Sequence, residues 1–222
     1  MKQGGIDGVK GFRIALALAA MLTTASAPGF PPENALLTEL NKLRADPKGY
    51  AAELRDFRKG FRGSIHYAPG ENVGWQTEEG IAAVDEAIAV LDRQTPLPSV
   101  GAGSLLAQAA SDHGGAQAKD GTEGHIGSDG TDPGDRVARR GGDVFVAEVI
   151  AYGSTSAADA MRQLIIDDGV ADRGHRVVLL DPSYRFAGAW CGPHPVWRQV
   201  CVMTLATTPD GTDPEVGTAE GA

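Results

Sequence analysis

The sequence has few cysteines, no cluster of basic residues and none of the common catalytic motifs. Only two of its 222 residues are cysteine, and its 20 lysines and arginines form no run. The formal net charge is −9, which argues against nucleic acid or anionic lipid as a partner. The patterns Gly-x-Ser-x-Gly, His-Glu-x-x-His, Gly-x-x-x-x-Gly-Lys and Cys-x-x-Cys are absent. No particular class of enzyme is therefore indicated by a motif.

The N-terminus has the pattern of a secretory signal. A basic lead precedes an apolar run over residues 14–22, which is too short to span a bilayer comfortably. Cleavage is expected after Ala27 or after Ala25, and an uncleaved anchor is the alternative. We predict a signal peptide over residues 1–27, a secreted or periplasmic protein, and no stable membrane span after cleavage.

The rest of the chain has the length and apolar content of one domain. Apolar residues make up 42% of the chain, enough for a core. We predict a single domain over 28–208 and a disordered acidic tail over 209–222, because the tail lacks apolar residues. Export also bears on Cys191 and Cys201, ten residues apart in a predicted hairpin. They form one disulfide if the register brings them together, and two buried thiols otherwise.

Apolar periodicity predicts helices first and strands later. Apolar residues recur at helical spacing from Leu36 to Leu43. Asp46 followed by proline has the pattern of an N-cap and a first helical residue, so a second helix is expected there. Further helices are expected after a cap at Thr77, over 104–119, over 133–140, and from Ser154 or Ser156 to a left-handed cap at Gly169. Residues 59–76 are expected to be loop. The segments 144–152, 186–190 and 200–206 have strand character, the last two forming a hairpin. This order predicts an α+β fold with helices packed on a small antiparallel sheet.

Two of the five histidines are candidates for chemistry. His125 and His175 each follow a glycine beside a predicted helix, and each has acidic neighbours. A histidine paired with carboxylates is what general acid–base chemistry or a divalent metal site requires. The spacing of fifty residues does not by itself bring them together. His113 lies on an apolar helical stripe and is interpreted as a core or rim residue, and His194 as an exposed loop residue.

Several acidic residues allow two interpretations. Glu148 is the only charge in the apolar run 144–152, so it is either half-buried with a partner or on the solvent face of a strand. The aspartates at 129, 132 and 135 have the wrong spacing for a calcium loop, and turn and capping roles explain them better.

Several colinear segments resemble bacterial members of the CAP superfamily, which includes cysteine-rich secretory proteins, antigen 5 and pathogenesis-related proteins (SCP-like domains). The similarity covers roughly residues 33–207 and is carried by Leu40-Asn41-x-x-Arg44, Ala-Ser-Asp-His113, Gly124-His125 through Arg136, Ala147-Glu148 through Gly153, Asp167 through Arg176, and the Cys191…Cys201 hairpin. Two asparagines usual in the family are replaced, because Glu148 is followed by Val149 and His175-Arg176 by Val177-Val178.

The resemblance implies an α-β-α sandwich with a cleft that holds two histidines and two acidic residues. Carried to this chain, these are His125, His175, Glu148 and either Asp167 or Asp168. In the family this cleft is associated with zinc or another divalent metal held by the histidines. We expect a non-enzymatic exported binding module for a small ligand, lipid or protein. The alternatives are a metal-dependent, peptidase-like hydrolase, with Glu148 or Asp167/Asp168 as base, and a sterol or lipid carrier.

Overall fold

A computed structural model describes residues 33–213 of the chain. The helices are α1 (Glu33–Ala45), α2 (Pro47–Arg58), α3 (Ile81–Arg93), α4 (Ser104–Asp120), α5 (Pro133–Arg139), α6 (Ala157–Ile166) and α7 (Gly174–Leu180). The strands are β1 (Phe61–Arg62), β2 (Ile65–His66), β3 (Trp75–Gln76), β4 (Gly101–Ala102), β5 (Val146–Tyr152), β6 (Phe186–His194) and β7 (Arg198–Ala206). None of these helices has the length and apolar character needed to cross a bilayer.

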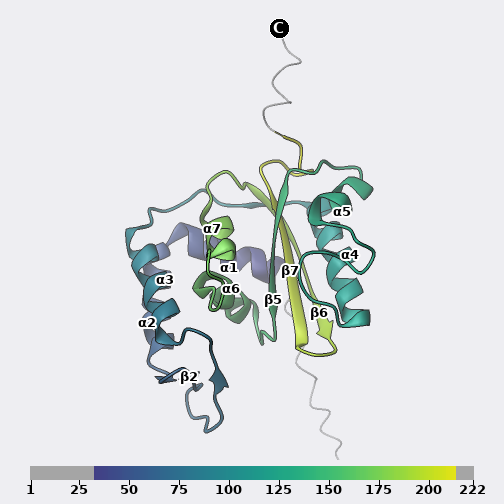
Figure 1. The fold of residues 1–222 in the computed structure, drawn as a ribbon. Helices are drawn as coiled ribbons and strands as arrows, with labels where there is room; N and C mark the ends of the chain where they lie inside the picture. The colour runs from purple at the N-terminus through teal and green to yellow at the C-terminus, as the bar shows by residue number, and fades with distance from the viewer. Residues whose placement is uncertain (1–32, 214–222) are drawn as a thin grey trace, which may run out of the picture.

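The strands β4-β6-β7-β5 form a sheet with helices on both faces (Figure 1). The long strands are antiparallel, and only the two-residue β4 pairs in parallel with β6. Alternate residues of β5 point to opposite layers: Val149 packs in the core with α1, α3 and α6, whereas Ile150 packs with Ala110 of α4. The α+β sandwich that the sequence predicts is confirmed.

Most of the predicted helices form where their signals lie. Leu36, Leu40 and Leu43 are buried on one face of α1. Asp46 caps α2 by accepting a hydrogen bond from the backbone of Gly49. Asp132 and Asp135 form a reciprocal capping box at the start of α5, so the capping role predicted for them is confirmed.

The segment between α2 and α3 differs from the prediction. Residues 59–76 contain a small three-stranded sheet, β1-β2-β3, rather than loop alone. The helix expected after Thr77 begins only at Ile81, because Thr77 donates its backbone N–H and hydroxyl to the Ser64 carbonyl and extends the small sheet. Backbone hydrogen bonding thus outweighs the local capping preference of threonine.

Three other boundaries also differ. Helix α6 ends at Ile166 with Asp167, not Gly169, as the left-handed cap (φ 59°). Strand β6 continues through His194, which shortens the hairpin loop. Residues 209–213 are bound to the domain, since the carbonyl of Asp210 accepts the Asp143 N–H at 2.9 Å. The rest of the predicted tail, 214–222, and the predicted signal, 1–27, lie outside the described residues.

The two cysteines form a disulfide. Cys191 of β6 and Cys201 of β7 are directly opposite in the antiparallel register. Of the two outcomes that the sequence allowed, the bridged one is therefore found.

Candidate functional site

His125 and His175 lie side by side although fifty residues separate them. Their ring centroids are 6.2 Å apart. His125 reaches the site from the loop between α4 and α5, and His175 is in the first turn of α7. Both stand beside β5, the edge strand of the sheet. The fold therefore brings together at this edge two histidines whose proximity the sequence spacing alone did not predict.

Each histidine is held through the same ring nitrogen by a carboxylate. Nδ1 of His125 lies 3.0 Å from Oε1 of Glu148, and Nδ1 of His175 lies 2.6 Å from Oδ1 of Asp167. A carboxylate at Nδ1 orients the ring and leaves Nε2 as the nitrogen open to other partners. Within residues 33–213, neither Nε2 makes a hydrogen bond.

Glu148 is buried with partners on two sides. Its side chain is 1% exposed, and its second oxygen accepts a hydrogen bond from Arg136 at 2.9 Å. Arg136 also donates to the carbonyls of Thr131 and His125. The buried guanidinium balances the carboxylate and fixes the loop that carries His125. Of the two positions that the sequence allowed for Glu148, the buried one is observed.

Three side chains form hydrogen bonds with the backbone of Gly124, the residue just before His125. Its carbonyl lies 2.8 Å from both the His113 imidazole and the Gln117 amide, and its N–H donates to the Tyr152 hydroxyl at 2.9 Å. Gly124 has a positive φ of 85°, which glycine adopts without strain. The buried polar set therefore sets the direction in which His125 leaves the backbone.

His113 is a core residue, as the helical stripe predicts. It is 1% exposed, and burial lowers the pKa of its imidazole. His194, in contrast, is not the exposed residue that its proline-flanked position suggested. It is 2% exposed, lies 3.1 Å from the Thr122 carbonyl and packs edge-on against Tyr152.

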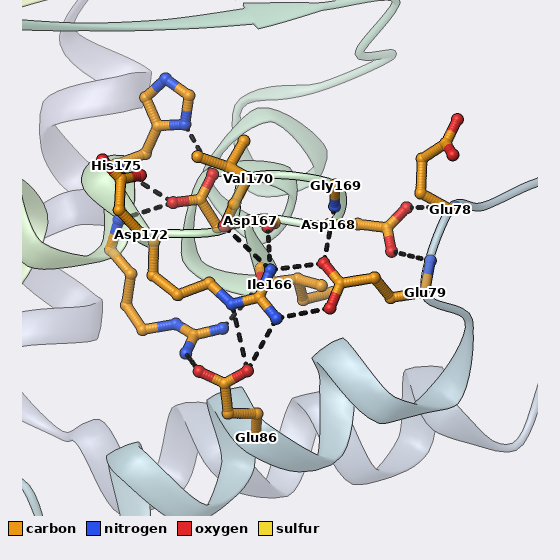
Figure 2. A network of polar contacts seen from close by, with 12 residues as sticks. Glu78, Glu79, Glu86, Ile166, Asp167, Asp168, Gly169, Val170, Asp172 and His175 are labelled. Atoms are coloured by element: carbon orange, nitrogen blue, oxygen red, sulfur yellow. Dashed lines mark hydrogen bonds and ion pairs between the residues drawn. The ribbon is translucent and has the colours of Figure 1, made fainter.

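The structure separates the two adjacent aspartates that the sequence left as alternatives. Asp167 turns toward His175 and also accepts the backbone N–H of that residue at 2.9 Å. Asp168 turns away and accepts the backbone N–H groups of Glu78 and Glu79 (Figure 2). The left-handed conformation at Asp167 ends α6, so Asp167 and Asp168 do not continue the helix and their side chains take different directions.

Two arginines bind the 167–176 segment to α3 and to Glu79, which precedes that helix. Arg173 forms ion pairs with Glu79 and Glu86, and Arg176 binds the other oxygen of Glu86 at 2.7 Å. Arg173 lowers the pKa of Glu79 to about 2 through a direct hydrogen bond. The histidine-bearing end of α7 is thus anchored by charges from a helix almost ninety residues earlier.

Sequence reasoning missed the supporting residues of the cleft. Arg136, Gln117 and Tyr152 are all buried or half-buried and hydrogen-bonded around the site. Arg136 ended one of the family-like segments, which was the available signal for it. Tyr152 also lies within a family-like segment, Ala147 through Gly153, whereas Gln117 has no signal beyond its helix position.

The two imidazole rings are the groups of this cleft that could donate to a metal ion. No group of three or more histidine, cysteine, aspartate or glutamate side chains among residues 33–213 is arranged to hold a metal ion. Two imidazoles backed by carboxylates match the donors that zinc and similar ions accept. A metal held here would need its remaining positions filled by solvent or by a ligand.

No protein-family model and no curated protein matches the sequence. The chain is similar in structure to an extracellular protein containing a SCP domain from Bacillus anthracis str. Ames, with 17% identity over 57% of this chain and a TM-score of 0.41. This chain spans 37% of that chain's length. It is also similar to an outer surface protein of Borrelia burgdorferi, with 13% identity, 73% and 92% of the two chains covered, and a TM-score of 0.41. Similarities at this level carry no argument about function, which rests on the site itself.

Proposed function

We propose that the chain is an exported, CAP-like binding module whose paired-histidine cleft binds a divalent metal ion, with zinc as the first candidate. The observation that carries the proposal is the matched pair His125–Glu148 and His175–Asp167, with ring centroids 6.2 Å apart. In this arrangement the carboxylates bind both Nδ1 atoms and orient the rings, which leaves the Nε2 atoms for an ion. Bound metal would present a Lewis-acidic position toward a small ligand.

Export is supported by the basic and apolar N-terminal pattern and by the disulfide. A bridge between Cys191 and Cys201 persists in oxidising compartments and is rare in reducing ones. The proposal therefore places the protein outside the cytoplasm, as a secreted or periplasmic domain.

Binding is favoured over hydrolysis by the positions of the carboxylates. Both oxygens of Glu148 are occupied, one by His125 and one by Arg136, and both oxygens of Asp167 are bound to His175. A general base must reach the proton of the attacking water. The side chains of Glu148 and Asp167 are only 1% and 2% exposed, and Asp168 binds the 78–79 backbone instead of turning toward the cleft.

Zinc titration of chelator-stripped protein by calorimetry tests the proposal. We expect one site in the wild type and its loss in both His125→Ala and His175→Ala, since two imidazoles share the ion. Glu123→Gln, an exposed neighbour of His125, is the matched control and should bind as the wild type does. Absence of zinc binding, or binding indifferent to both histidine changes, would remove the metal from the proposal.

A lipid carrier is the second candidate, because an apolar groove exists. A hollow of about 600 Å³ lies between α1 and α4 and is lined by Leu37, Ala107, Ala189 and Met203 among others. Organic extraction of protein purified from its native compartment, followed by mass spectrometry, tests this function. A stoichiometric lipid that is lost on Ala107→Glu would support it, and clean extracts would contradict it.

A further inference from the structure

A second hollow is formed by residues that are distant in sequence from the histidine cleft. It has a volume of about 800 Å³ and is lined by α2, by the segment of the small β1-β2-β3 sheet and by Arg162 of α6. The small sheet stands apart from the β5–β7 strands, near the end of α2 (Figure 1). None of the residues that line the hollow belongs to the cleft. Its volume falls within the roughly 300–1,000 Å³ typical of small-molecule sites.

An aromatic stack forms one wall of this hollow. The His66 ring on β2 lies parallel to Phe57, with centroids 3.9 Å apart. The Trp75 ring on β3 lies on the other strand, with its centroid 4.4 Å from that of His66. Trp75 nevertheless remains 46% exposed. A large indole fixed by stacking and left open to solvent offers a rigid, flat apolar surface to a ligand.

His66 adds a buried polar atom that lacks a partner. Its Nε2 lies 2.9 Å from the Phe57 carbonyl, which can only accept, so Nε2 carries the proton. Burial lowers the pKa of His66, which keeps the ring neutral and makes Nδ1 an acceptor. Nδ1 is inaccessible to solvent and has no hydrogen-bond partner among residues 33–213. A buried acceptor of this kind is satisfied when a hydroxyl or N–H group reaches it.

The charges around the hollow are balanced and largely paired. Three acidic and three basic side chains line it, namely Glu53, Asp56, Glu71, Lys59, Arg62 and Arg162. Glu53 is paired with Lys42, Asp56 with Lys59, and Arg162 with Asp159. A cage for a cation would carry an excess of carboxylates, and an anion site an excess of basic groups. The balance favours a neutral ligand that bears hydrogen-bonding groups.

We propose that this hollow binds a neutral sugar ring, as a unit of an oligosaccharide. The apolar C–H face of a pyranose matches the open indole of Trp75, and its hydroxyls match the mixed donors and acceptors of Asn72, Arg62 and His66 around it. The site is separate from the metal cleft, so the proposal does not rest on zinc binding.

Calorimetry and tryptophan fluorescence with cellotriose, triacetylchitotriose and maltotriose test the proposal on the intact protein. We expect saturable binding of at least one trisaccharide, and a loss of about three- to tenfold in affinity in Trp75→Ala. Trp197→Ala is the matched control, because Trp197 is 44% exposed but lies on the β6–β7 hairpin. It should leave the affinity unchanged.

Further variants separate stacking from hydrogen bonding. Asn72→Ala, at an exposed position, should weaken the same trisaccharide without loss of fold by circular dichroism. His66→Phe retains an aromatic ring in the stack but removes Nδ1 together with the Nε2 bond to the Phe57 carbonyl. It should also weaken binding while circular dichroism shows the fold retained. The proposal is overturned if no trisaccharide binds saturably, if Trp197→Ala weakens binding as much as Trp75→Ala, or if tetramethylammonium binds at the site and the sugars do not.

Discussion

The carboxylate of Asp167 binds His175 at two points. Oδ1 lies 2.6 Å from the imidazole Nδ1, and Oδ2 accepts the backbone N–H of the same residue at 2.9 Å. The aspartate therefore fixes both the ring orientation and the start of α7. Its neighbour Asp168 has the same charge but binds the 78–79 backbone instead, so the pair provides an internal comparison.

Asp167→Asn should weaken zinc binding about 10–100-fold, the usual effect of altering a carboxylate behind a metal-binding histidine. The asparagine retains an acceptor but loses the charge that increases the basicity of the imidazole. Calorimetric titration measures the change. Asp168→Asn should have little effect on zinc affinity, and an equal loss in both variants would show that the role assigned to Asp167 is wrong.

Arg136→Met should destabilise the domain by about 3–5 kcal/mol, because it leaves the buried Glu148 carboxylate without its guanidinium partner. Chemical denaturation followed by circular dichroism measures the loss. Arg139, three residues further along α5, makes an exposed pair with Asp129, so Arg139→Met should leave the midpoint almost unchanged.

The pairing of Arg136 with Glu148 also predicts a partial rescue. Removing both charges in Arg136→Met/Glu148→Gln should recover part of the stability, since the penalty arises from the unpaired buried charge. A double variant as unstable as the sum of both single variants would contradict this account.

Much of the fold was readable from the sequence because its signals are local. Leu36, Leu40 and Leu43 repeat at helical spacing, and Asp132-Pro133 marks the start of α5 through side-chain capping. The boundary at Thr77 was wrong for the converse reason. Its hydrogen bonds go to Ser64, across a small sheet whose strands have only two residues each and leave no detectable period.

The candidate site was predictable in its members but not in their arrangement. The family-like segments indicated His125, His175 and Glu148, whereas periodicity allowed both Asp167 and Asp168 to face the cleft. A left-handed backbone conformation at a non-glycine residue decides between them. His194 was misjudged because the strand that buries it extends past the proline that the sequence suggested as a boundary.

The ion pair of Glu79 with Arg173 should make stability depend on pH in the acid range. The pKa of Glu79 falls from 4.5 to about 2 in the folded protein, so the stabilisation is present above pH 4.5 and is lost as pH falls toward 2. The difference in Tm between the wild type and Glu79→Gln should therefore shrink over this window. A difference that stays constant from pH 6 to pH 2 would contradict the assignment, and about 1 M salt should reduce it at neutral pH.

The disulfide should contribute to stability mainly by restricting the unfolded chain. Cys191 and Cys201 close a short loop around the β6–β7 turn, for which chain entropy predicts roughly 2–3 kcal/mol. Cys191→Ala/Cys201→Ala should unfold at lower denaturant concentration but retain the fold, because the two nine-residue strands remain paired. The wild type should shift toward the double variant when a reductant is added, and the double variant should not respond. A wild-type midpoint unaffected by complete reduction would show that the bridge does not stabilise the domain.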